Sequence, residues 1–131
     1  ECYVNADFAG GWDQNDPHDA SNLFSRLGFV IKYADCPIYW SGKLLTEIAL
    51  STAKAEYIAL SSSLREVIPL MAVMDELNKV FPLLMEVPQF YCKVWEDNQS
   101  CIAMATSQKF TPRTKHIALK YHHFKGHVKS G

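Results

Sequence analysis

Three acidic residues that lie far apart in the sequence stand where their carboxylates could meet. Asp7 lies in the first apolar stretch with Asn5 two residues before it, Glu56 lies in the run AKAEYIAL, and Asp97 lies in WEDNQS. Residues two apart on a strand face the same side, so Asn5 and Asp7 are expected to share a face. Glu56 is unusual because its neighbours in the run are apolar and helix-packing residues: Ala55, Ile58 and Ala59.

The chemistry that such a cluster supports is metal-assisted cleavage of a phosphodiester. Carboxylates brought together repel one another unless they share a cation. Hard oxygen ligands favour magnesium or manganese, and two such ions about 4 Å apart can activate a water and stabilise the leaving oxygen. The alternative is that each acid is solvated or caps a helix, and for Asp97 alone this explanation is equally good.

The hydrophobic pattern predicts the elements that must position these acids. Three strands with short connections favour an antiparallel meander, with a polar, turn-rich loop at residues 10–21 between the first two. The predicted strands are residues 1–8, residues 23–33, and a third that starts at PIYWSG after a turn at ADCP.

The second half of the chain changes to a helical period. Ser51 is expected to cap a helix through TAKAEYIALSSSLREV, Pro69 to kink or restart it, and LMAVMDELNKVF to continue as a second segment. Residues 89–95 are predicted to form a fourth strand, followed by a short helix, QSCIAMATS, capped by Asn98 or Asp97. A last helix is expected near residues 115–129.

This order of elements predicts one α/β domain over residues 1–131, with a mixed sheet: strands one to three antiparallel, a fourth strand parallel, and flanking helices. The long helical crossover between strands three and four predicts that these two form the parallel pair. There is no repeat, linker or low-complexity tract.

Composition is that of a soluble globular protein, with 48% hydrophobic and 21% charged residues. No run of about 18 uncharged apolar residues exists, so no membrane span is expected. The start is unlike a signal peptide and lacks Met, which suggests a piece of something longer. The four scattered cysteines predict reduced thiols in an intracellular protein and no zinc site.

The net charge of −1 hides an asymmetry. Residues 1–97 hold all 14 acidic residues, whereas residues 98–131 hold six of the 13 Lys and Arg, four of the five His and no acid. This is either a solvated tail or a basic surface for a polyanion beside a separate acidic site.

Five blocks of the sequence, in order, resemble the ribonuclease H domain of copia-type LTR retrotransposon polyproteins: VNADFAG, PIYWSGK, ALSTAKAEYIALS, EDNQSCIA and TPRTKHIALKYHH. The family typically shows D-A-D-W/F-A-G, P-I-S-W, A-L-S-S-x-E-A-E-Y-I-A-L, C-D-N-Q-S-A-I and R-T-K-H-I. The resemblance covers nearly the whole chain. It implies a ribonuclease H-like fold that cleaves RNA in RNA–DNA hybrids with two Mg²⁺ or Mn²⁺ ions. It also implies a reverse transcriptase polymerase domain in the same polyprotein, and a cytoplasmic virus-like particle.

The resemblance also implies residue roles. Glu56 matches the second Glu of E-A-E-Y and Asp97 the Asp of D-N-Q-S, so both would be catalytic metal ligands. The catalytic Asp of the first strand corresponds to Asn5, and Asp7 matches the second Asp of D-A-D, a further ligand position.

The chain departs from the family pattern in four respects. Asn5 removes a charge expected to bridge both ions, so weak or absent activity is predicted. Lys54 replaces the first Glu of E-A-E-Y, and Ala118 stands where many relatives have Asp. The fifth strand and final helix of the fold, with a fourth acid, are expected to be missing.

Substrate contacts are predicted for Asn98 and Gln99, and for Arg113, Lys115 and His116, whose phosphate contacts would give affinity with little sequence specificity. Capping by Asn98 and solvation of the basic loop are the competing explanations.

One histidine and two tryptophans each have a functional and a packing interpretation. His122 is a candidate proton shuttle, although packing is an alternative role for it. Trp40 and Trp95 could stack on bases, but their strand positions favour the core.

Three functions remain open from the sequence. The first is an endonuclease acting on the RNA strand of a hybrid. The second is a catalytically degenerate ribonuclease H-fold module that binds nucleic acid or supports a polymerase. The third is a nuclease or recombinase relative with the same core and another substrate, since fold does not fix substrate.

Overall fold

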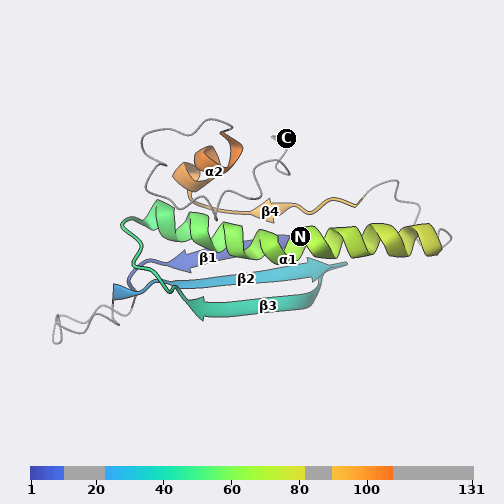
Figure 1. Cartoon of the computed structure of the whole chain (residues 1–131), viewed down its shortest axis with the longest axis horizontal. Coiled ribbons are helices and arrows are strands. Elements are labelled where there is room, and N and C mark those ends of the chain that lie inside the picture. The colour runs from blue at the N-terminus through green and yellow to red at the C-terminus, as the bar shows by residue number, and fades with distance from the viewer. Residues whose placement is uncertain (11–22, 82–89, 108–131) are drawn as a thin grey trace.

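The computed structural model describes residues 1–10, 23–81 and 90–107, which form a four-stranded sheet and two helices (Figure 1). The strand order is β3-β2-β1-β4, with β4 parallel to β1 and the other neighbouring pairs antiparallel. The predicted α/β class with a mixed sheet is therefore confirmed. The elements in chain order are β1 (Cys2–Asp7), β2 (Arg26–Tyr33), β3 (Cys36–Leu44), α1 (Thr52–Val80), β4 (Val94–Trp95) and α2 (Gln99–Thr106).

The core lies between α1 and one face of β1 and β2. Both strands alternate, so every second side chain faces α1 and is buried, while the intervening ones face away. The helix supplies a dense row of buried residues from its first half, among which Tyr57 is fully buried. The buried strand residues are Cys2, Val4 and Ala6 of β1 and Leu27, Phe29 and Ile31 of β2.

A two-residue turn joins β2 to β3. Its central residues, Ala34 and Asp35, have φ values of 48° and 62°. Positive φ at both central positions is the backbone of a type I′ turn, whose twist matches that of the flanking strands. The expected turn at ADCP is thus present, although neither central residue is glycine.

The prediction that Trp40 and Trp95 belong to the core is wrong. Trp40 is 68% exposed and Trp95 is 42% exposed. Trp40 pairs with Val30, and Trp95 pairs with Tyr3. The residues before and after Val30 and Tyr3 face α1, so both tryptophans point away from the helix. Trp95 stacks on Tyr3 with ring centroids 6.1 Å apart.

α1 is a single helix of 29 residues that continues through Pro69, so the expected restart at this residue is wrong, whereas the expected kink stays a prediction. The Ser51 side chain accepts a hydrogen bond from the Lys54 backbone N–H at 3.1 Å, which confirms the predicted cap. Pro69 is exposed, so its ring lies on the side of the helix away from the sheet. On both sides of Pro69 the helix packs against the core, through the buried Val67 and the partly buried Ile68, Leu70 and Met71.

By length and composition alone, α1 could cross a membrane, although the sequence was expected to hold no such span. Its most apolar window is 44% buried inside the structure. A helix that forms the centre of a core needs an apolar face for that reason alone.

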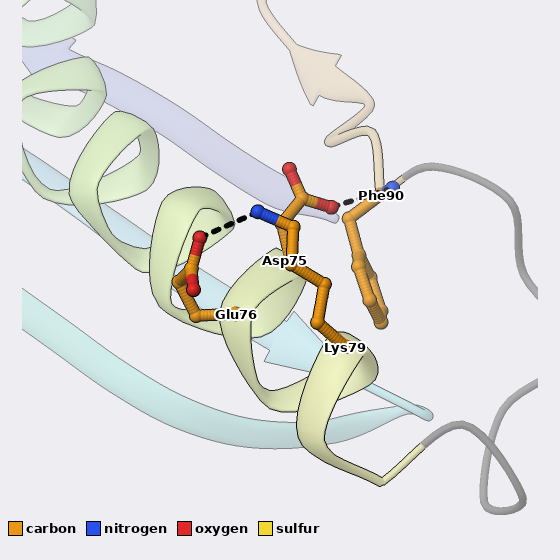
Figure 2. A network of polar contacts seen from close by, with 4 residues as sticks. All are labelled: Asp75, Glu76, Lys79 and Phe90. Carbon is orange, nitrogen blue, oxygen red and sulfur yellow. Dashed lines mark hydrogen bonds and ion pairs between the residues drawn. The ribbon is translucent and has the colours of Figure 1, made fainter.

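The chain leaves α1 and is tied back to it before β4 begins. The Asp75 carboxylate accepts a hydrogen bond from the Phe90 backbone N–H at 3.3 Å, while Lys79 pairs with Glu76 at 2.6 Å on the exposed side (Figure 2). The segment then runs along β1, where the Cys2 N–H donates to the Lys93 carbonyl at 2.9 Å.

This path corrects two predictions about the fourth strand. The strand runs in the same direction as β3 but pairs with β1, because the crossover passes over β2 and β1 to the other edge of the sheet (Figure 1). Its ladder covers Val94–Trp95 only, not residues 89–95. Most of the predicted loop at residues 10–21 and the predicted helix near residues 115–129 lie outside the described residues.

Candidate metal centre

Glu56 is the deepest acid of the predicted site. It lies in the first half of α1 on the face that packs against β1, and it is only 4% exposed. Its carboxylate lies beside the Ala6 backbone, and a hydrogen bond there partly offsets the cost of burial. Its Oε2 atom is buried and has no hydrogen-bond partner. An ionised carboxylate in this position is expensive unless a proton or a cation accompanies it.

Two more acids follow β4, at the turn that leads into α2. Asn98 caps α2 with its side-chain oxygen, which accepts from the Cys101 N–H at 3.0 Å. The same turn brings the Asn98 backbone N–H to the Oε1 atom of Glu96, at 3.0 Å. Glu96 is half-buried and Asp97 is exposed. The turn therefore presents two successive carboxylates at the end of the parallel strand.

Glu56, Glu96 and Asp97 converge. Each offers one carboxylate oxygen, and the three oxygens all lie within 4.8 Å of one another. They come from the interior, the boundary and the surface of the protein in turn, so the cluster reaches from the core to solvent. The structure thus brings together Glu56 and Asp97 as expected, and adds Glu96.

Burial and mutual repulsion make this cluster electrostatically costly. Burial, with the neighbouring charges of Glu96 and Asp97, raises the pKa of Glu56 to about 7. Burial and the charge of Asp97 also raise the pKa of Glu96, although hydrogen bonds from the backbone N–H groups of Asn98 and Asp97 act in the opposite direction. Below neutral pH a proton can relieve the repulsion, and above it a cation is needed.

The donor set fits a hard divalent cation. Three carboxylate oxygens are the ligands that Mg²⁺ and Mn²⁺ prefer. Oxygens on opposite sides of a Mg²⁺ ion lie about 4.2 Å apart, so small movements of the side chains would suffice to close the site around an ion. In addition, the Oε2 atoms of Glu56 and Glu96 are both buried without a hydrogen-bond partner. These residues could therefore hold a divalent metal.

Asn5 lies on β1 and faces the side of the sheet away from Glu56. It lies two residues beyond Tyr3, which pairs with Trp95, the last residue of β4. Its side chain is exposed, on the face away from α1. Asn5 and Glu56 thus lie on opposite sides of β1, and the predicted role of Asn5 in the metal site stays a prediction.

Asp7 lies outside the cluster of three acids. It ends β1, and its carboxylate lies directly over Gly10, where the Cβ of any other residue would collide with it. Its predicted role as a metal ligand stays a prediction.

The predicted substrate-binding residues divide into two groups. The side-chain oxygen of Asn98 is used in the α2 cap, which supports the capping alternative, and Gln99 is exposed on the first turn of α2. Arg113, Lys115, His116 and His122 lie outside the described residues, as does Ala118.

Glu96 is the functional candidate that sequence reasoning missed. The family pattern C-D-N-Q-S has cysteine at position 96, so the resemblance predicted only Asp97 as a ligand in this segment. The available signal was the pair of adjacent acids that directly follow a strand. A strict strand alternation would have sent their side chains to opposite faces, but the strand ends at Trp95 and the turn brings both to one place.

Comparison with known proteins gives homology to segments of plant transposon polyproteins. The chain is 34% identical over 120 residues, 92% of its length, to the retrovirus-related Pol polyprotein from transposon TNT 1-94 of Nicotiana tabacum. It is 30% and 29% identical over 130 residues, 99% of its length, to the retrovirus-related Pol polyproteins from transposons RE2 and RE1 of Arabidopsis thaliana. It spans 8% of the length of each of these relatives. No family model and no solved structure matches the chain.

Proposed function

We propose that this chain is the ribonuclease H domain of a retrotransposon Pol polyprotein, and that it cleaves the RNA strand of RNA–DNA hybrids with Mg²⁺ or Mn²⁺. The observation that carries the proposal is the convergence of Glu56 and Asp97 at the end of a strand parallel to β1. The homology to retrovirus-related Pol polyproteins supports it independently. The mixed sheet with one parallel strand is compatible with a ribonuclease H-like fold.

In this function Glu56 and Asp97 would hold the metal, which when bound activates a water and stabilises the leaving 3′-oxygen. Glu56 gives the site a fixed, water-poor side because its helix packs on the sheet. Asp97 is exposed, so a phosphate of the substrate can approach from solvent. Gln99, exposed two residues after Asp97, is proposed to contact the RNA strand. The basic segment with Arg113, Lys115 and His116 is proposed to contact phosphates, and His122 to shuttle a proton.

The setting of this activity is proposed from the relatives. Because they are Pol polyproteins of which the chain spans 8%, a polymerase domain that makes the hybrid is the proposed partner within the same polyprotein. An intracellular, cytoplasmic virus-like particle is the proposed location.

The test is cleavage of a labelled RNA–DNA hybrid by residues 1–131 with Mg²⁺ or Mn²⁺, assayed beside single-stranded RNA and duplex DNA. The Asn5→Asp variant is assayed in parallel, because the amide is a poor ligand and the parent chain is expected to be weak. We expect metal-dependent cleavage of the hybrid by the variant, abolished by Asp97→Asn and by chelation. No cleavage of hybrid by Asn5→Asp would overturn the enzyme proposal.

One observation favours a second candidate, a binding or structural module. Asn5 on β1 carries no charge where the family pattern has a carboxylate. Salt-sensitive binding of the hybrid without cleavage by Asn5→Asp would support this module, and absence of binding would leave a structural role. Cleavage of duplex DNA without hybrid binding would instead favour the third class, a nuclease or recombinase relative.

A further inference from the structure

The site contains two buried oxygens that the protein itself does not satisfy. They are the Oε2 atoms of Glu56 and Glu96, and neither has a hydrogen-bond partner. Buried polar atoms in folded proteins are nearly always paired, and those of carboxylates are the most costly to leave alone. The two atoms belong to side chains of the same cluster, so a cation bound by the cluster would give both carboxylates a partner.

The surroundings of Glu96 hold its carboxylate in place. Its Oε1 atom accepts from the Asn98 N–H, which α2 fixes because Asn98 is the cap of that helix. The Cys101 thiol, fully buried on α2, also lies against Glu96. With Oε1 held by the Asn98 N–H, Oε2 is the Glu96 oxygen that is buried and left without a partner. This is the arrangement of a positioned ligand, since its orientation is fixed before any ligand binds.

We infer that Glu96 is a direct ligand of one divalent cation, held by Glu56, Glu96 and Asp97, and that it supplies the carboxylate that Asn5 does not. The inference rests on the proposed metal-dependent function and adds a residue that the family pattern does not provide. That pattern has Asp at position 5 and Cys at position 96, whereas this chain has Asn and Glu. Across these two positions the number of carboxylates is unchanged, but the carboxylate stands in the turn after β4 instead of on β1.

The exchange moves the cation. Asn5 faces the side of the sheet away from α1, whereas Glu56 lies on the α1 side and Glu96 converges with it. A cation held by these three carboxylates therefore sits toward α1 and needs no ligand from β1. The chain is expected to bind one ion tightly where the resemblance implies two.

The experiment measures metal binding without any substrate. Residues 1–131 are titrated with Mn²⁺ by calorimetry, and with Tb³⁺ followed by luminescence sensitised through Trp95, which is adjacent to Glu96. Luminescence lifetimes in H₂O and D₂O count the waters on the ion. The variants are Glu96→Gln and Asn5→Asp, with Glu66→Gln as the matched control, because Glu66 is an exposed acid of α1. Circular dichroism checks that each variant folds.

We expect one Mn²⁺ per chain for the parent and for Glu66→Gln. Glu96→Gln should bind at least about tenfold more weakly, since loss of even a supporting group around a metal costs that much, and bound Tb³⁺ should gain water. Asn5→Asp should retain the first ion and bind a second. Parent-like affinity and hydration in Glu96→Gln would overturn the inference, as would absence of Mn²⁺ binding by the parent.

The outcome separates this inference from the proposed function. If Mn²⁺ binds through Glu96 but Asn5→Asp cleaves no hybrid, the ligand assignment stands and the nuclease proposal fails. If hybrid is cleaved while Glu96→Gln binds metal like the parent, the reverse holds.

Discussion

Glu56 of α1 and Asp97 at the end of β4 offer carboxylate oxygens within 4.8 Å of each other, although residues 57–96 separate them in the chain. The distance depends on three elements at once. α1 packs on β1, β4 pairs with β1, and the turn into α2 directs Asp97 back toward the helix. Because the cluster contains unpaired buried oxygens, we expect substitutions or pH changes that alter its charge to change the stability of the protein and its affinity for metal.

The first prediction concerns the pH dependence of stability through Glu56. Its pKa is about 7 in the folded protein and near 4.5 when unfolded, so between these values the folded state binds more protons. The free energy of unfolding of the metal-free protein should therefore fall as pH rises from about 4.5 to 7, by on the order of 3 kcal/mol. Glu96, whose pKa is also raised, acts in the same direction.

Glu56→Gln should remove most of this fall, because an amide has no proton to lose. Urea unfolding in chelator at pH 5 and pH 8 measures the effect, with Glu66→Gln as the control. The metal-free variant should be more stable than the parent at pH 8 while binding no Mn²⁺. An unchanged pH slope in Glu56→Gln would show that Glu56 is not the group responsible.

The second prediction concerns Asn5. Replacing it with Asp adds a carboxylate on the face of β1 away from α1, at the position where the family pattern has one. Hybrid cleavage in Mn²⁺ should rise by at least about tenfold, which corresponds to about 1.4 kcal/mol in the barrier. Asn5→Ser is the control, because it changes the amide without adding charge. A gain of the same size in Asn5→Ser would rule out charge as the cause.

The sequence pattern predicted the strands and helices in which buried and exposed residues repeat with a regular spacing. The strands β1 and β2 and the Ser51 cap are local properties that the sequence predicted, and it narrowed the cap of α2 to Asn98 or Asp97, of which the structure shows Asn98. The approach of Glu56 and Asp97 was expected from a resemblance, since spacing along the chain does not specify which strands become neighbours.

The errors came from contacts between distant segments. β4 could pair at either edge of the sheet, depending on where α1 crosses the sheet. The sequence up to α1 does not determine this crossing. Trp40 was assigned to the core because it lies in a strand, yet its pairing with Val30 places it on the face of the sheet away from α1. Glu96 was missed because the sequence does not fix the residue at which β4 ends. If the strand continued past Trp95, Glu96 and Asp97 would point to opposite faces, whereas a strand that ends at Trp95 lets them converge.

The third prediction concerns Pro69. Within a helix, proline cannot donate the hydrogen bond to the carbonyl four residues earlier, which costs about 3 kcal/mol relative to alanine. α1 is continuous through this position and Pro69 is exposed, so Pro69→Ala should restore the bond without disturbing the core. We expect an increase of roughly 1–3 kcal/mol in the free energy of unfolding.

Chemical denaturation measures this gain, and Glu66→Ala, one turn earlier on the exposed side, serves as control for propensity alone. A loss of stability in Pro69→Ala would mean that the helix needs a kink there, as the sequence had suggested.

The last prediction separates two roles of Asn98. Its side-chain oxygen caps α2, and its backbone N–H holds Glu96, so the helix cap and the metal centre share one residue. Asn98→Ala removes the capping oxygen and should cost about 1 kcal/mol of stability. It should also weaken Mn²⁺ binding, because the turn that orients Glu96 loses its support.

Serine caps as well as asparagine does but has no amide, so Asn98→Ser should recover both stability and metal affinity. If Asn98 acts as a cap, Asn98→Ser should also bind hybrid like the parent in a fluorescence anisotropy titration. Parent-like stability with reduced hybrid affinity in Asn98→Ser would instead assign the amide to substrate binding, because the cap alone would then be intact.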